Sequence, residues 1–91
     1  MIDINNLIKT EPEIKKTIAS NFKKRRKEHK KSQKQMEKES GVSLGSLKRF
    51  EQSGEISLSS LIKLSQSIDE ENNLLNLFTS PYYENIEDML E

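Results

Sequence analysis

The sequence predicts an all-α fold: a compact bundle of four or five short helices, with a short extension at each end. Two observations favour this fold class. Apolar residues recur at three- and four-residue spacing along most of the chain, whereas the alternation typical of strands is almost absent. Helix-capping residues also stand before most of these apolar segments, and a glycine follows two of them. With 91 residues, of which 32% are hydrophobic, we expect a single domain with a thin core.

The first helix is expected to begin after Thr10 and to end near Lys30. Thr10 can cap this helix, Glu13 stands three residues later as a capping-box partner, and Pro12 is tolerated in the first turn. Its apolar residues recur every four positions, which predicts one face directed to the core. These residues are Ile14, Ile18 and Phe22, with Ala19 beside them.

The next two helices are expected to be short and joined by a tight turn. The second begins at Ser32 and ends at Ser40, where Gly41 supplies the left-handed backbone that stops a helix. Ser43 can cap the third helix, which ends before Gly54. For these helices to cross steeply, four apolar residues must pack together: Met36, Val42, Leu47 and Phe50.

The fourth helix is expected to begin at Ser57 and to reach Ile68. Its inward-facing residues are expected to be Leu58, Leu61, Ile62 and Leu64. Asp69 is expected to cap a fifth helix with a broad apolar face formed by Leu74, Leu75, Leu77 and Phe78. This face is most simply part of the core, and the alternative is a partly exposed dimer contact.

The ends of the chain are assigned to extensions of the domain. Residues 1–9 show no clean periodicity and are interpreted as an arm or a short helix, so residues 1–10 are assigned to an N-terminal arm. Pro81 ends the globular part, so the domain is expected to span residues 11–79 and an acidic tail residues 80–91. Residues 86–90 hold one more weak helical pattern.

Charge divides the chain into two halves, although the formal net charge is zero. Residues 1–50 contain 14 Lys or Arg against 6 Asp or Glu, a net charge of +8, and residues 51–91 contain 1 against 9, a net charge of −8. A polarised chain of this kind favours a basic face that binds a polyanion, despite a pI of about 6.6.

Several function classes are excluded by composition. The chain has no cysteine and one histidine, which removes disulfides, thiolate catalysis and zinc-finger chemistry, so we expect no metal and no cofactor. The sequence contains no nucleophile elbow or other catalytic constellation, so we expect no enzyme. No apolar run approaches the roughly 18–20 residues of a membrane span, and no signal-peptide pattern opens the chain. These features predict a soluble, cytoplasmic protein.

Residues 32–51 predict a helix-turn-helix, because two short helices meet at a tight turn around Gly41. The second of these helices would direct a polar face outward, formed by Leu44, Gly45, Lys48, Arg49 and Gln52. A helix face of this size fits the DNA major groove, which is about 12 Å wide. The basic run at residues 23–31 precedes the motif and is interpreted as a phosphate clamp, with a solvated helix face as the alternative.

The motif residues resemble those of the lambda-repressor-like, XRE-type helix-turn-helix proteins. The residues that carry the resemblance are Gln33, Met36, Gly41, Val42, Ser43, Leu47 and Glu51, followed by Ile56, Ser57, Leu58 and Leu61. The resemblance covers residues 14–78 and implies a four- to five-helix bundle that binds DNA. Residues 44–61 are similar to the HipB-like antitoxins, which pair with HipA-type kinase toxins.

The resemblance implies roles for individual residues. The positions that would read base edges are Leu44, Gly45, Lys48 and Arg49. For Arg49 the alternatives are a phosphate contact or a pair with Glu51 or Gln52, and for Lys48 a backbone contact. The positions that would contact phosphates, together with the basic run, are Lys24, Lys31, Ser32, Gln33, Ser43 and Ser46. Arg26 and Glu51 match a largely buried ion pair.

One residue departs from the family pattern at the contact between the two motif helices. Glu37 stands where the family nearly always has alanine. We expect it either to bend outward or to pair with a nearby cation such as Lys38 or Lys48.

The function predicted from these observations is a sequence-specific regulator of transcription, most simply a repressor. It would bind double-stranded DNA as a homodimer, with residues 43–52 in the major groove. One alternative is an antitoxin that neutralises a HipA-like kinase toxin through its C-terminal region, with DNA autoregulation secondary. Another, which Glu37 and Gly45 leave open, is a helix-turn-helix fold that has lost DNA binding.

Overall fold

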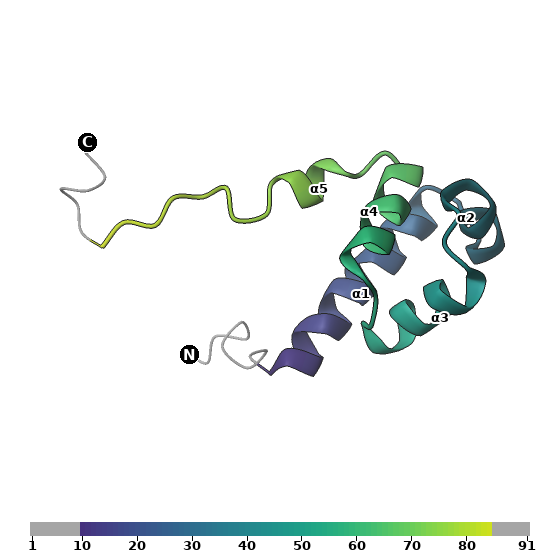
Figure 1. Cartoon of the computed structure of the whole chain (residues 1–91), viewed down its shortest axis with the longest axis horizontal. Helices are drawn as coiled ribbons and strands as arrows, with labels where there is room; N and C mark the ends of the chain where they lie inside the picture. Colours follow the sequence, from purple (N-terminus) through teal and green to yellow (C-terminus); the bar gives the residue numbers. More distant parts are fainter. Residues whose placement is uncertain (1–9, 85–91) are drawn as a thin grey trace.

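Four helices form where their capping residues predict them. A computed structural model describes residues 10–84 of the chain, and this part is helical without a strand (Figure 1). Its helices are α1 (Glu11–Glu28), α2 (Gln33–Ser40), α3 (Leu44–Ser53), α4 (Leu58–Ser67) and α5 (Asn72–Leu75). The expected all-α bundle is confirmed. The expectations for residues 1–9 and 86–90 lie outside the described residues.

Each of the first four helices begins with a side-chain cap. The capping hydroxyl accepts a hydrogen bond from the backbone N–H three residues later, at 3.0–3.4 Å. The caps are Thr10, Ser32, Ser43 and Ser57. At the other end, α2 and α3 stop at Gly41 and Gly54, whose φ angles are 79° and 82°. Only glycine adopts this backbone without strain, so both stops are encoded locally.

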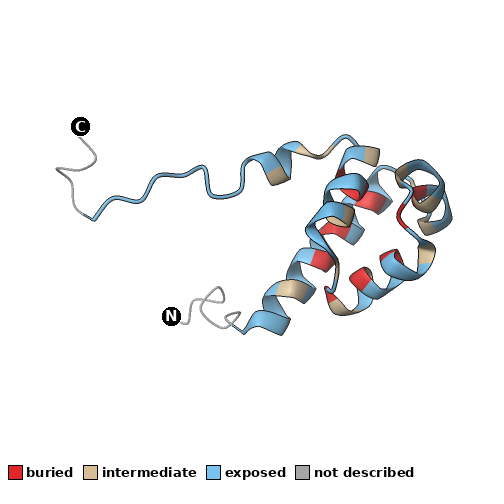
Figure 2. Ribbon diagram, in the orientation of Figure 1, coloured by how far each residue is buried: buried red, intermediate tan, exposed pale blue. Residues whose placement is uncertain are grey.

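The core lies between α1, α2, α3 and α4, and buried residues, red in Figure 2, come from all four helices. The helix α1 packs mainly against α3, and α2 packs against both α3 and α4. The rings of Phe22 and Phe50 join α1 to α3, with centroids 5.5 Å apart in a tilted arrangement. The core residues are Ala19, Phe22, Met36, Val42, Leu47, Phe50, Leu64 and Ile68. The predicted packing of the motif residues is therefore confirmed.

Four apolar residues that were expected to face the core are instead exposed. Ile14 and Ile18 on α1 are 44% and 47% exposed, and Leu58 and Ile62 on α4 are 65% and 38% exposed. The reason is the arrangement of the helices. Because α1 packs on α3 while α4 packs mainly on α2, the sides of α1 and α4 that carry these residues are only partly covered.

The fifth helix is shorter than predicted and is not part of the core. Asp69 does not cap it, because this residue has a left-handed backbone with φ of 56° and α5 starts only at Asn72, after Glu71 without a side-chain cap. Phe78 also has a left-handed backbone, which ends any helical continuation. The exposed fractions are 70% for Leu75, 53% for Leu77 and 99% for Phe78, so the expectation of a core face is wrong. The alternative, a dimer contact, stays a prediction.

Candidate nucleic-acid interface

The helix α3 is fixed on one side and open on the other. Leu47 and Phe50 are almost fully buried and hold α3 against α1 and α2. The opposite side carries the residues predicted to face outward: Gly45, Lys48, Arg49 and Gln52 are exposed, and Leu44 is half-buried. The structure thus brings all five residues to the outer surface of one helix, where no other described helix covers them.

At Gly45, the outer face of α3 carries no side chain. A Cβ atom at this position would meet nothing within 4 Å, so packing inside the protein does not require a glycine here. Its neighbour Leu44 occupies the first turn of α3 and keeps part of its side chain accessible. The absence of a side chain at Gly45 allows a bound molecule to approach the backbone closely.

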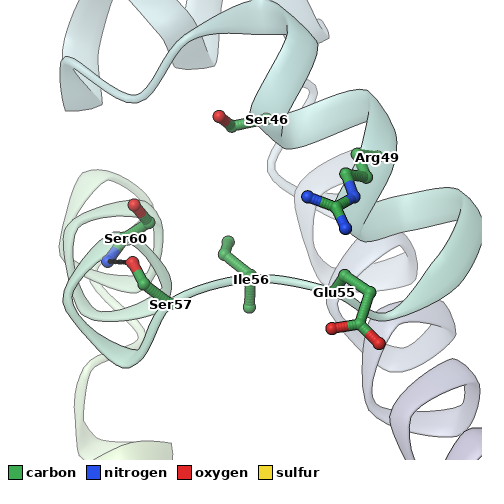
Figure 3. A pocket seen from close by; sticks show the side chains of 6 residues that line it. All are labelled: Ser46, Arg49, Glu55, Ile56, Ser57 and Ser60. Atoms are coloured by element: carbon green, nitrogen blue, oxygen red, sulfur yellow. Dashed lines mark hydrogen bonds between the residues drawn. The ribbon is translucent and has the colours of Figure 1, made fainter.

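The side chain of Arg49 extends into a hollow between α3 and the start of α4 (Figure 3). The hollow has a volume of about 310 Å³ and is lined by Ser46, Arg49, Glu55, Ile56, Ser57 and Ser60. Within residues 10–84 the guanidinium makes no hydrogen bond to Glu51 or Gln52. A side-chain hydrogen bond from Lys15 lowers the pKa of Glu55, and the charge of Arg49 adds a smaller lowering. The donors of Arg49 therefore remain available.

Behind α3, a buried ion pair joins three helices. Arg26 on α1 donates two hydrogen bonds to the Glu51 carboxylate of α3, at 2.7 and 2.9 Å, and a third to the backbone oxygen of Lys31 at 2.8 Å. The two charged side chains are only 8% and 3% exposed. Gln33 on α2 also donates to Glu51, at 3.1 Å. Glu51 thus fixes the positions of α1 and α2 relative to α3.

Among residues 10–84, some of the residues expected to contact phosphates already use their polar groups within the protein, whereas others are free to bind. The hydroxyls of Ser32 and Ser43 cap α2 and α3, and Ser43 also donates to Ser46 at 2.8 Å. The ammonium of Lys31 pairs with Glu39 at 2.9 Å, whereas Lys24 is exposed and makes no ion pair within the described residues. The contact of Gln33 with Glu51 is not predictable from a local sequence pattern, because the two residues are 18 positions apart.

Glu37 neither bends outward nor pairs with Lys38, Lys48 or another lysine of residues 10–84, so both expectations for it are wrong. Its Oε2 atom accepts a hydrogen bond from the backbone N–H of Leu44 at 2.6 Å. This N–H belongs to the first turn of α3 and has no partner within the helix. A carboxylate at a helix N-terminus is also stabilised by the helix dipole. Glu37 is therefore a second cap of α3, donated by α2, which local capping patterns do not reveal because it stands seven residues earlier.

We expect Glu37→Ala to lower the free energy of unfolding by about 1.5–3 kcal/mol, since hydrogen bonds to charged groups contribute this much. Glu37→Gln keeps an oxygen acceptor, so its free energy of unfolding should fall less than that of Glu37→Ala. Urea denaturation of both variants checks the result. The control is Glu39→Ala on the same helix, which removes the exposed ion pair with Lys31 and a long hydrogen bond from Gln35 and should cost about 0–1 kcal/mol. Equal losses in Glu37→Ala and Glu39→Ala would show that the second cap contributes nothing.

The comparisons with known proteins agree with this geometry. A family described as Helix-turn-helix matches residues 22–71, which include α2, α3 and α4 and the last two turns of α1. No curated protein and no solved structure matches the chain. Within residues 10–84, no helix is both long enough and apolar enough to cross a membrane. Because the family match covers more than half of the chain, the protein belongs to the lambda-repressor-like, XRE-type helix-turn-helix family of DNA-binding regulators.

Proposed function

We propose that the protein is a sequence-specific repressor that inserts α3 into the major groove of double-stranded DNA. The observation that carries this proposal is the exposed face of α3, on which Arg49 makes no ion pair within residues 10–84, with the ion pair of Arg26 and Glu51 behind it. Arginine binds guanine with two hydrogen bonds, and such a contact distinguishes base pairs by about 1–3 kcal/mol. Repression follows from occupancy of an operator.

The basic run contributes fewer free charges than its composition indicates. Of its seven Lys and Arg residues, three pair with carboxylates: Arg25 with Glu28, Arg26 with Glu51 and Lys31 with Glu39. The four that make no ion pair within residues 10–84 are Lys23, Lys24, Lys27 and Lys30. These four lysines are the candidates for phosphate contacts, and each contact would add about 0.9 to the slope of log affinity against log salt concentration.

Two substitutions separate base reading from phosphate binding. Arg49→Ala is expected to reduce the preference for an operator over a scrambled duplex by about 5- to 150-fold. Lys24→Ala should weaken binding to both duplexes equally and lower the salt slope by about 0.9, because a phosphate contact carries no sequence information. The measurement is fluorescence anisotropy with a labelled duplex from the region upstream of the gene and its scrambled counterpart, at several salt concentrations.

The matched control for both variants is Lys63→Ala. Lys63 is an exposed residue of α4 and the only Lys or Arg in residues 51–91. Its loss should leave unchanged both the preference for the operator over the scrambled duplex and the slope of log affinity against log salt concentration. If Arg49→Ala and Lys24→Ala both behave like Lys63→Ala, insertion of α3 into the groove is wrong.

We also propose that the regulator acts as a homodimer in the cytoplasm. Two-fold repressors place two recognition helices about 34 Å apart, one turn of DNA, so that each reads one half of a palindromic operator. The alternative function, an antitoxin for a kinase-like toxin, is favoured by no specific contact in residues 10–84.

A further inference from the structure

Lys15, at the start of the second turn of α1, lies between two carboxylates. Its ammonium nitrogen is 2.9 Å from Oε1 of Glu55, which follows α3, and 2.8 Å from Oε1 of Glu11, one turn earlier on α1. The side chains of Lys15 and Glu55 are 35% and 46% exposed. Exposed ion pairs contribute little to stability, so this pair is not needed to hold the fold.

The packing of α3 on α1 brings Lys15 and Glu55 together, although they are 40 positions apart. At Gly54, which ends α3, the chain passes so close to α1 that a Cβ atom would lie 2.5 Å from Cβ of Lys15. The backbone N–H of the next residue, Glu55, donates a hydrogen bond to the hydroxyl of Ser53 at 3.2 Å, which stabilises the turn after the helix. The carboxylate of Glu55 therefore lies within reach of the Lys15 ammonium.

Glu55 is also a neighbour of Arg49. Both residues line the hollow between α3 and the start of α4, and Figure 3 shows the carboxylate of Glu55 pointing away from the guanidinium. The two side chains form no ion pair within residues 10–84, yet the charge of Arg49 acts on the carboxylate. The pKa of Glu55 is lowered mainly by the hydrogen bond from Lys15 and to a smaller extent by Arg49. A carboxylate so near could bind the guanidinium in place of a base if no other cation held it.

We propose that Lys15 is a positioning residue for DNA recognition, which holds Glu55 away from Arg49 so that the guanidinium stays available to a base. The inference rests on the proposed function, in which Arg49 reads a base pair, and it requires no contact between Lys15 and DNA. Without the ammonium, Glu55 pairs with Arg49, and this pair must break before a base is bound. The expected penalty is roughly 2- to 5-fold in affinity for the operator, the upper part of the range for an exposed ion pair.

The test is Lys15→Met, which removes the ammonium and keeps an apolar side chain of similar length beside Gly54. Fluorescence anisotropy with the upstream duplex and its scrambled counterpart should show the preference reduced by roughly 2- to 5-fold. In Lys15→Met/Glu55→Gln the competing carboxylate is absent, so the wild-type preference should return. Glu55→Gln alone should leave the preference unchanged, because Lys15 already holds that carboxylate. Circular dichroism should show the wild-type fold for all three variants, since the pair is exposed.

Lys16→Met is the matched control. Lys16 is the next residue of α1, is exposed and makes no ion pair within the described part of the chain, so its loss removes the same charge from the same helix. Loss of a phosphate contact weakens binding to both duplexes equally, so the preference should not change in this variant.

A second measurement needs no DNA. In ¹H–¹⁵N NMR spectra of the free protein, the side-chain Nε–H signal of Arg49 can be identified by its loss in Arg49→Ala. This signal should shift in Lys15→Met, because the guanidinium then pairs with Glu55. It should return to its wild-type position in Lys15→Met/Glu55→Gln. A role of Lys15 in stability alone would not produce a shift that depends on Glu55.

Three results would overturn the proposal. They are an Arg49 signal that does not shift in Lys15→Met, a loss of preference in Lys15→Met that Glu55→Gln does not rescue, and a preference that falls in Arg49→Ala but no more in Lys15→Met than in Lys16→Met. Failure of the proposed function gives a different pattern. In that case Arg49→Ala itself leaves the preference unchanged, whereas the NMR shift still shows that Lys15 keeps Glu55 from Arg49.

Discussion

Glu51→Ala is expected to lower the free energy of unfolding by about 3–5 kcal/mol, which is the cost of removing one partner of a buried ion pair. The carboxylate of Glu51 accepts both hydrogen bonds from Arg26 and a third from Gln33. Without it, the guanidinium of Arg26 remains in a site where its side chain is only 8% exposed, with one backbone oxygen as a partner. A small domain has a total stability of about 5–15 kcal/mol, so the loss is a large fraction of the whole.

Urea denaturation followed by circular dichroism measures this loss. Glu51→Gln retains an oxygen acceptor and gives a measurable folded state if Glu51→Ala does not fold. The control is Glu55→Ala, which breaks the exposed pair between Glu55 and Lys15 and should change stability little. The double variant Arg26→Met/Glu51→Leu replaces both charges with apolar groups and should be more stable than Glu51→Ala. If Glu51→Ala lowers the free energy of unfolding no more than Glu55→Ala does, the buried ion pair does not stabilise the domain.

The second large effect is expected for Gly54→Ala, at about 2–5 kcal/mol of destabilisation. Part of this cost, about 1–2 kcal/mol, is the left-handed backbone of Gly54, with φ of 82°. The rest is overpacking, about 1–3 kcal/mol, because a Cβ atom would lie 2.5 Å from Cβ of Lys15 and 2.6 and 2.7 Å from its backbone C and O. To relieve this contact, the C-terminal end of α3 must move away from α1.

Gly41→Ala is a matched control for this prediction. Gly41 ends α2 with nearly the same φ, 79°, but a Cβ there would meet nothing within 4 Å. Its cost should be the backbone part alone, about 1–2 kcal/mol. Parallel urea titrations of the two variants give the difference. If both variants lose the same free energy, the close approach of α3 to Lys15 does not limit what position 54 tolerates.

Much of the local structure could be predicted from the residues alone. The caps at Thr10, Ser32, Ser43 and Ser57 and the stop at Gly41 were all expected, and the helices form there. These signals act through hydrogen bonds and backbone angles within three or four positions, so a linear pattern contains them. The family was also predictable, because the spacing of the motif residues depends on a turn that is itself local.

The exposure of the apolar residues was less predictable. Ile14 and Ile18 share a helical stripe with Phe22, yet only Phe22 is buried. The period of a stripe indicates which side of a helix is apolar but not which other helix covers it. For α1 the covering helix is α3, and the exposed Ile18 borders an apolar groove between α1, α4 and α5.

In the candidate site, too, the features set by neighbouring residues in the sequence were predictable, whereas contacts between different helices were not. The outward face of α3, including Arg49, follows from helical periodicity and from the buried Leu47 on the opposite side. The contact of Glu37 with the Leu44 backbone and that of Gln33 with Glu51 connect different helices, as does the hollow beside Arg49. Such contacts depend on the angles at which helices cross, and these angles are set by packing of the whole core rather than by any single segment.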